Sequence, residues 1–389
     1  AAWEFASTLR EELRETEGAL RRKHPYVSGT EFTPKRNNST QGYVEGASFT
    51  RLKELNPTSR DHIAWILQQH YGWKPKQKTT TGKPVIDEVI LTEIGSEIST
   101  MFARCLTVTK MLGMLSNGAN GWLKLVTNEG RIHHHCSVAT ATHRCASRSP
   151  NLQQVPSDDR FRRLFVPSKG LCMVGADLSG IELRMLSHYL ARYDGGRYAE
   201  ILLNGDIHQT NADKIGITRK QVKTVTYAFL YGAGDEKIGH SFDAQLSTAA
   251  AKRKGKEIRA AYVDAVDGLG ELLEAVKKAA EKGSIKSIDG RKIAVDSPHK
   301  SLNYLLQSGA GVVAKRWMVI NQDHIKELGL CCSQLAFVHD ELQFEVDPKH
   351  AQDLCSSLVL SATEAGEYYN IRCRIDAEAT TGKNWSETH

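Results

Sequence analysis

The segment that most restricts the fold is LAFVHDELQFEV, residues 335–346. Both halves are rich in apolar residues, as in two strands, and three polar residues, His339, Asp340 and Glu341, stand between them. Two such runs joined by a short polar connection predict a β-hairpin with Asp340 near its tip. The acids either form a solvated turn or are presented to a second carboxylate elsewhere in the chain.

Asp177 is the candidate for that second carboxylate. In residues 174–193 a buried strand ends at Asp177, and a helix is predicted to begin at Ser179 or Gly180. The apolar positions of this helix are Ile181, Met185 and Tyr189. An acid at the end of a buried strand is costly unless it is paired or binds a metal, although capping of the helix is the simpler explanation. Together, Asp177 and Asp340 fit a two-metal site for phosphoryl transfer.

A third segment, TRKQVKTVTYAFLYGAG at 218–234, predicts a helix that begins with the capping box of Thr218 and Gln221. At about 100° per residue, one face carries Arg219, Lys223 and Tyr227. The packing face carries Val222, Val225 and Phe229. Cations in the N-terminal half of a helix oppose its dipole, so we expect an anionic partner such as a triphosphate. The alternative is a solvated charged face.

The rest of the chain is predicted from periodicity and turn residues. We expect an amphipathic helix at 3–23, an extended or loop-like segment at 25–58, a helix capped by Ser59 or Thr58, and a helix at 93–116. Strands are predicted at 122–126, 130–135 and 171–178. Two helices are expected within 180–230, followed by the basic segment 252–259, a helix to about 282, and a final strand–helix–strand region.

Composition excludes few functions. A net charge of +6, from 51 basic and 45 acidic side chains, permits nucleic-acid binding. No run reaches the roughly 20 apolar residues of a membrane helix and no signal peptide is recognisable, so a cytoplasmic protein without a membrane partner is expected. The eight cysteines form no CxxC pair, and the HHHC cluster at 133–136 with His143 and Cys145 fits no standard zinc finger. A P-loop motor is disfavoured because GxxxxGK[ST] is missing.

Three segments in this order, DLSGIELR, RKQVKTVTYAFLYG and VHDEL, resemble motifs A, B and C of family A DNA polymerases. LNGDIHQTN, FLYGAGDEKIG, SPHKSLNYLLQSGAG and GKNW are similar to the replicative polymerases of short-tailed phages. The resemblance covers about 55–389 and implies an α+β right-hand fold. The implied parts are a helical thumb at 1–129 with a short insertion or loop at 25–50, an antiparallel-sheet palm at 130–210 and 290–389, and helical fingers at 211–289.

The resemblance implies template-directed addition of deoxynucleotides to a primer 3′ end, in phage replication and so in the host cell cytoplasm. Asp177, Asp340 and the Leu178 carbonyl would hold two Mg²⁺ ions, for which Mn²⁺ is a substitute, with Glu341 as a supporting acid. Arg219, Lys223 and His208 would contact phosphates, and Lys223 would protonate pyrophosphate. Tyr227 would stack on the nucleotide, Tyr231 would lie near the templating base, and Glu182 would exclude a 2′-hydroxyl. The DNA contacts would be Arg144, Asn151, Gln154, Asn303, Gln307 and His339.

One departure from the family concerns the residue before Arg144, which is often Gly and here is His143. The first 130 residues carry no DxE metal motif, so we expect no proofreading on this chain. Only the short stretch around 25–50 stands where some phage relatives carry a long thumb insertion that binds thioredoxin, so no thioredoxin dependence is expected. Candidate partners beyond primer–template DNA and deoxynucleoside triphosphates are a separate exonuclease, a helicase-primase and a single-strand-binding protein. The alternatives are a single-subunit RNA polymerase, which Glu182 disfavours, and a noncatalytic DNA-binding relative, which the retained acids and cations disfavour.

Overall fold

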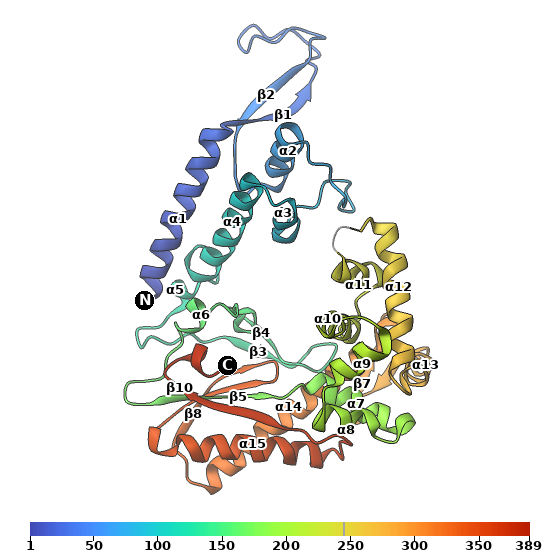
Figure 1. Ribbon diagram of the computed structural model, residues 1–389. Coiled ribbons are helices and arrows are strands. Elements are labelled where there is room, and N and C mark those ends of the chain that lie inside the picture. The colour runs from blue at the N-terminus through green and yellow to red at the C-terminus, as the bar shows by residue number, and fades with distance from the viewer. Residues whose placement is uncertain (244–245) are drawn as a thin grey trace. The chain divides into compact units, whose positions relative to one another are not determined.

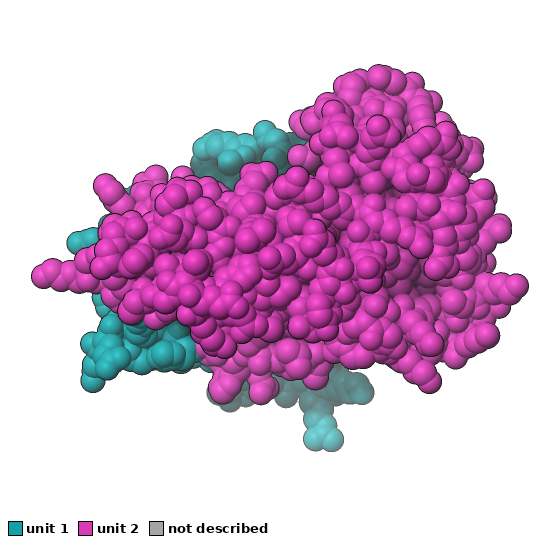
Figure 2. All heavy atoms as spheres, turned by 90° about the horizontal axis from the view of Figure 1, so that it is seen from below, with its two compact units in different colours: residues 1–133 teal, residues 134–389 magenta. Residues whose placement is uncertain are grey.

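The computed structural model describes residues 1–243 and 246–389, and the chain divides into two compact units. The first unit spans residues 1–133 and the second residues 134–389, coloured teal and magenta in Figure 2. Each unit buries its own cluster of apolar side chains, so each has its own hydrophobic driving force for folding. Within the described residues, no helix has the length and apolar character needed to cross a bilayer.

The first unit is mostly helical (Figure 1). Its helices are α1 (Ala2–Lys23), α2 (Arg60–Tyr71), α3 (Glu88–Ile94), α4 (Glu97–Leu112) and α5 (Trp122–Leu125), with a π-helical turn at Gly113–Asn117. Ser59 caps α2 by accepting a hydrogen bond from the backbone N–H of His62, which confirms one of the two predicted caps. The single helix expected at 93–116 is interrupted because Gly95 adopts a left-handed φ of 65° between α3 and α4.

In the first unit one prediction is made more specific and another is wrong. The segment 25–58, expected to be extended or loop-like, contains the strands β1 (Tyr26–Phe32) and β2 (Phe49–Glu54), which pair antiparallel. Aromatic rings support this pair, with centroids 5.0 Å apart for Phe32 and Tyr43 and 5.1 Å apart for Tyr43 and Phe49. The strand predicted at 122–126 is instead the short helix α5, whose Trp122 is buried.

The second unit contains a four-stranded antiparallel sheet in the order β10–β5–β9–β8. Its strands are β5 (Cys172–Leu178), β8 (Cys332–Val338), β9 (Glu341–Val346) and β10 (Ala377–Gly382). The helices α14 (Ser301–Glu327) and α15 (Ala351–Tyr368) pack together, and α15 lies against β5 and β10 (Figure 1). The wholly buried Trp317 of α14 donates its indole N–H to the Leu358 carbonyl of α15 over 2.8 Å. The predicted final strand–helix–strand region and the strand at 171–178 are thus confirmed.

In the described part of the chain, seven further helices lie between β5 and β8 in sequence. They are α7 (Ile181–Asp194), α8 (Arg197–Asn204), α9 (Ile207–Ile215), α10 (Arg219–Leu230), α11 (Asp235–Phe242), α12 (Thr248–Ala265) and α13 (Leu269–Ala280). The prediction of two helices within 180–230 is wrong, because glycines divide the segment into four. Gly195, Gly196 and Gly216 all adopt left-handed φ angles that end or begin a helix there. The basic segment 252–259 lies inside α12.

Short elements complete the second unit. They are the hairpin β3 (His135–Ser137) and β4 (Ala146–Arg148), the hairpin β6 (Ser284–Lys286) and β7 (Lys292–Ala294), the helix α6 (Asp159–Arg162), and 3₁₀ turns at Leu152–Gln154, Pro298–Lys300, Pro348–His350 and Trp385–Glu387. The strand predicted at 130–135 is displaced, since β3 only begins at His135. No group of three or more His, Cys, Asp or Glu side chains suited to a metal ion is found in the described part of the chain.

Candidate active site

The hairpin predicted at 335–346 is present and brings Asp340 to Asp177. β8 ends at Val338 and β9 begins at Glu341, and His339 adopts a left-handed φ of 59° in the connection. β9 pairs with β5 so that Glu341 lies opposite Asp177, and the Leu178 N–H donates to the Asp340 carbonyl over 3.1 Å. We call Asp177 and Asp340 the acidic platform. Strand register, set by contacts far apart in the sequence, places the two aspartates together.

The acidic platform is electrostatically unfavourable by itself. Burial raises the pKa of Asp177 to about 7, with Asp340 and Glu341 adding repulsion. Burial, followed by repulsion from Glu182, raises the pKa of Asp340 to about 6. No ion pair is found for either carboxylate among residues 1–243 and 246–389. Two partly buried, unpaired oxygen donors fit hard divalent cations such as Mg²⁺, which would supply the missing positive charge.

Glu341, the next residue after Asp340, is placed very differently. Its carboxylate is buried and accepts hydrogen bonds from the Gln343 amide over 2.7 Å and the Trp385 indole over 2.5 Å. His389 Nδ1 lies 2.9 Å from its other oxygen. Glu341 therefore joins the start of β9 to the segment 385–389. Glu341 was expected as a supporting acid, but nothing near it in the sequence marks Trp385 and His389 as its partners.

Glu182 accepts hydrogen bonds from two of the other predicted site residues. It lies in the first turn of α7 and is 9% exposed. One of its oxygens accepts a hydrogen bond from Arg144 over 2.7 Å and one from the Tyr231 hydroxyl over 3.0 Å. Burial, followed by the Glu182 charge, raises the pKa of Tyr231 to about 12, so this hydroxyl stays a donor at neutral pH. Glu182 thereby links three distant segments beside Asp340.

His143 adopts the backbone conformation that a glycine before Arg144 would favour. Its φ is 58°, in the left-handed region. Lys315 donates to the His143 carbonyl over 2.6 Å, and the imidazole Nδ1 lies 2.9 Å from the Ser308 hydroxyl oxygen. A Cβ added to Gly311 would come within 2.9 Å of the Arg144 side chain, so this glycine permits the close approach. The departure from glycine is accommodated by contacts with α14.

The predicted face of α10 forms as expected. The Thr218–Gln221 capping box is present, and the packing residues Val222, Val225 and Phe229 are buried.

On the other face of α10, Lys223 is exposed and has no ion pair within the described residues. The rings of Tyr227 and His208 have centroids 6.1 Å apart. Burial, then repulsion from Arg219 and Lys223, lowers the pKa of His208, so its imidazole is neutral at pH 7. We call His208, Arg219, Lys223 and Tyr227 the triphosphate face, after the ligand expected there from the sequence.

Arg219 already has an anionic partner, which the sequence analysis missed. Its Nε donates to a carboxylate oxygen of Asp206 over 2.6 Å. The other oxygen of Asp206 caps α9 by accepting the backbone N–H groups of His208 and Gln209, each over 3.0 Å. An aspartate just before an apolar helical run is a readable cap signal, but its ion pair with the next helix is not readable from the sequence.

The residues expected to contact DNA fall into two groups. Asn303 and Gln307 lie on α14: the Asn303 amide donates to the Leu230 carbonyl over 2.6 Å, and Gln307 donates to Asn303 over 3.3 Å. His339 has its pKa lowered by burial and then by Arg144, so it lies near that residue. Asn151 caps the 3₁₀ turn at Leu152–Gln154 by accepting the backbone N–H of Gln153.

Asn151 and Gln154 are both exposed, and no contact with another predicted site residue is found for either side chain among those the structure describes. The neighbouring Gln153 is instead tied into the β4 region, because its side chain bonds Ser147 and Cys145. Hydrogen bonds thus hold Asn303 and Gln307 beside the end of α10, and His339 lies near Arg144, whereas the side chains of Asn151 and Gln154 are exposed.

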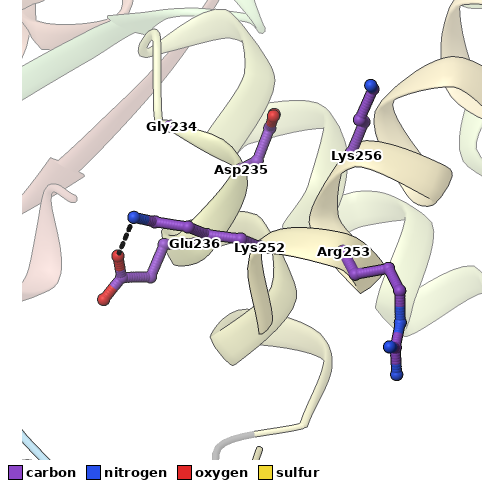
Figure 3. Close-up of a pocket in the computed structure, with 6 residues that line it drawn as sticks. All are labelled: Gly234, Asp235, Glu236, Lys252, Arg253 and Lys256. Atoms are coloured by element: carbon purple, nitrogen blue, oxygen red, sulfur yellow. Dashed lines mark ion pairs between the residues drawn. The ribbon is translucent and has the colours of Figure 1, made fainter. Parts of the chain in front are cut away.

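A basic groove lies between α11 and α12, with a volume of about 580 Å³. Figure 3 shows its lining residues, Gly234, Asp235, Glu236, Lys252, Arg253 and Lys256. Lys252 lies 3.8 Å from Glu236, and Arg259 pairs with Asp235 over 2.6 Å, so both acids are neutralised. For Arg253 and Lys256, no ion pair is found within the described ranges. The groove therefore carries excess positive charge shortly after Tyr231 in the chain.

Close helix packing fixes the walls of this groove. A Cβ added to Gly255 of α12 would come within 1.8 Å of the Asp235 carbonyl, and one added to Gly239 of α11 within 2.0 Å of the Ala251 carbonyl. Only glycine permits these two backbones to approach so closely. The cations of α12 are consequently held at a defined position relative to the segment that follows α10.

Comparison with known proteins places this geometry in a family. The profile of DNA polymerase family A matches residues 32–387. The DNA-directed DNA polymerases of Enterobacteria phage T3 and Escherichia phage T7 are 33% and 32% identical over 94% of this chain. In both cases the chain spans 59% of the relative's length. DNA polymerase I of Pseudomonas aeruginosa is 26% identical over 87% of the chain and 39% of its own length.

A solved structure shows the same fold. The POL domain of Pol1 from M. smegmatis, in complex with DNA primer-template and dNTP, matches with a TM-score of 0.79 and 22% sequence identity. The match covers 100% of this chain and 66% of that one. The order of the three motifs, the antiparallel sheet that carries the acidic platform and the profile match agree. The chain belongs to DNA polymerase family A.

Proposed function

We propose that this chain is a template-directed DNA polymerase that adds deoxynucleotides to a primer 3′ end during phage genome replication. The observation that carries the proposal is the acidic platform, where the partly buried Asp177 and Asp340 have raised pKa values and no protein cation paired with them within the described residues. Family membership and the phage relatives support it. The single-subunit RNA polymerase and the noncatalytic DNA-binding protein have no support among these relatives.

Asp177, Asp340 and the Leu178 carbonyl are the proposed ligands for two Mg²⁺ ions, with Mn²⁺ as a substitute. When bound, such ions activate a hydroxyl nucleophile and neutralise phosphate charge. The protein's own part is to position the reactants. Arg219, Lys223 and neutral His208 provide N–H donors to a triphosphate, and Lys223, exposed and unpaired within the described ranges, is the proposed proton donor to pyrophosphate.

The nucleotide is recognised by its sugar and its base. Tyr227 is the proposed stacking surface, and Tyr231 is proposed to lie near the templating base. Hydrogen bonds from Arg144 and Tyr231 hold the carboxylate of Glu182 in place, and this carboxylate is proposed to lie beneath the sugar. A fixed side chain at that point leaves no room for a 2′-hydroxyl, so deoxynucleotides are preferred. The proposed DNA contacts are Arg144, Asn151, Gln154, Asn303, Gln307 and His339.

The proposed parts of the right hand are those expected from the sequence: a thumb at 1–129, a palm at 130–210 and 290–389, and fingers at 211–289. The four-stranded sheet carrying the acidic platform lies within the palm ranges, and α10, α11 and α12 lie within the fingers range. Primer–template DNA and deoxynucleoside triphosphates are the partners this proposal requires.

Primer extension tests the proposal. The chain is incubated with a primed template, Mg²⁺ and either deoxy- or ribonucleotides, beside Asp340→Ala and the control Asp323→Ala, which alters an exposed acid on α14. Extension with deoxynucleotides that is lost in Asp340→Ala but kept in Asp323→Ala supports the proposal. Primer–template binding without any extension would indicate the noncatalytic relative, and extension with ribonucleotides would indicate an RNA polymerase.

A further inference from the structure

The Asp206 carboxylate lies beside the triphosphate face, which is proposed to bind a polyanion. A negative charge there would repel a triphosphate unless it has a structural purpose. Asp206 and Arg219 are 43% and 51% exposed, so the attraction between them is screened by water. The role of Asp206 therefore depends on its hydrogen bonds more than on its charge alone.

The hydrogen bonds of Asp206 converge from two helices. One oxygen accepts the backbone N–H groups of His208 and Gln209 at the start of α9, and the other accepts Arg219 Nε at the start of α10. His208 and Arg219 are both members of the triphosphate face. One carboxylate thus joins the helix turns that carry two of the proposed phosphate donors.

The geometry also leaves Arg219 able to bind a second anion. Asp206 occupies Nε, whereas no hydrogen bond from either terminal guanidinium nitrogen of Arg219 is found within the described residues. An arginine presents five N–H donors in a rigid planar arrangement, so fixing one edge orients the remaining donors. The hydrogen bond from Arg219, more than any other interaction, lowers the pKa of Asp206, which is therefore ionised at neutral pH.

We propose that Asp206 is a positioning residue that orients Arg219, and the helix turn carrying His208, for the triphosphate of the incoming nucleotide. The gain from preorganising these donors exceeds the repulsion between Asp206 and the triphosphate, because a donor held in place loses less freedom when it binds. This inference rests on the proposed polymerase function and concerns the same site.

Asp206→Asn is the decisive variant. Asparagine caps a helix about as well as aspartate, so α9 keeps its start, while the charged acceptor for Arg219 is lost. We expect the KM for deoxynucleotides to rise roughly three- to ten-fold, the scale of losing an exposed charged hydrogen bond, with kcat changed less than about two-fold. Affinity for primer–template DNA is expected to stay unchanged. Asp267→Asn is the matched control, since Asp267 pairs with Arg197 over 3.3 Å outside the triphosphate face.

A double-mutant cycle shows whether Asp206 acts through Arg219. In an Arg219→Ala background, Asp206→Asn is expected to leave KM unchanged. An equal rise in KM in both backgrounds, or a KM that stays the same or falls in Asp206→Asn alone, would overturn the inference. Asp206→Ser, which also retains a cap acceptor, repeats the measurement if the amide lowers the melting temperature. The unaltered chain failing to extend a primer would refute the polymerase proposal instead, so the two failures are distinguishable.

Discussion

Asp340 and Glu341 are neighbours in one hairpin and burial raises the pKa of both, yet their carboxylates differ in their protein partners. Glu341 is buried with hydrogen bonds from Gln343 and Trp385 and with His389 beside it, so the protein satisfies it. Asp340 is paired with no cation in the described part of the chain, and burial with nearby acids raises its pKa to about 6. A buried acid without an internal partner marks a place where the fold relies on a ligand for charge compensation. The contrast separates an acid that serves the fold from one proposed to serve the reaction.

The largest expected effect tests this contrast directly. Asp340→Ala should reduce primer extension by roughly 10³-fold or more, because a metal ligand contributes several kcal/mol of transition-state stabilisation. Glu341→Gln keeps an oxygen acceptor for Trp385 and should reduce extension by only about ten-fold. Single-turnover extension rates at saturating nucleotide measure both. Equal losses in the two variants would show that the neighbouring acids share one role.

Glu182 differs from both Asp340 and Glu341. It is a buried acid with protein partners, and those partners also belong to the proposed site. Glu182→Ala leaves Arg144 and Tyr231 without their acceptor and opens space beneath the sugar. We expect the preference for deoxy- over ribonucleotides, taken as the ratio of kcat/KM values, to fall by roughly 10²-fold. Tyr231→Phe, which removes one hydrogen bond but keeps Glu182, is the control. An undiminished preference in Glu182→Ala would contradict the assigned position of this side chain.

The stability of the acidic platform should depend on pH in a defined direction. The pKa of Asp177 is about 7 in the folded chain and about 3.9 when unfolded, so the folded state binds more protons between these values. This group therefore lowers the free energy of unfolding as pH rises from about 4 to about 7, and its effect is constant above that range. Without divalent cations at pH 8, Asp177→Asn should stabilise the chain by about 1–2 kcal/mol after allowance for solvent screening.

Thermal or urea unfolding at pH 8 and at pH 5 measures this effect. The stabilisation by Asp177→Asn should be smaller at pH 5, where Asp177 is already largely protonated in the folded state. Addition of Mg²⁺ at pH 8 should stabilise the unaltered chain more than the variant. Asp323→Asn serves as the exposed-acid control. Destabilisation of Asp177→Asn at pH 8 would show that this carboxylate has an internal partner after all.

The smallest expected effect concerns the basic groove. There the charges without an ion-pair partner among the described residues are cations, whereas at the acidic platform they are acids. Arg253→Ala combined with Lys256→Ala should weaken binding of primer–template DNA with a long single-stranded template by roughly three- to ten-fold. The salt dependence of binding should also decrease, because fewer counterions are released. Fluorescence anisotropy at several salt concentrations measures both. Lys254→Ala is the control, since Lys254 is paired with Glu257 over 2.9 Å. If the double variant weakened the binding of blunt-ended DNA equally, the groove would not contact the single-stranded template.

The local elements near the site were largely predictable because their signals lie close together in the chain. The capping box of Thr218 and Gln221 begins α10, and the apolar runs on either side of Asp340 form the hairpin. Secondary structure was predicted less well where the sequence offered only composition or a short apolar run. Within 25–58, Tyr26–Phe32 and Phe49–Glu54 pair as strands supported by aromatic contacts, and Trp122–Leu125, expected to be a strand, is helical. Short apolar runs suit either structure, so packing decided between them.

By itself, the sequence determined the order of the three motifs, the chemistry available at Asp177 and Asp340, and the charged face of α10. Tertiary structure alone decided which acids are satisfied and which are not: Trp385 for Glu341, Arg144 and Tyr231 for Glu182, and Arg219 for Asp206. The physical reason is that a carboxylate's stability depends on the donors and charges that surround it. Those donors come from strands and helices distant in the chain, and their positions exist only after the chain has folded.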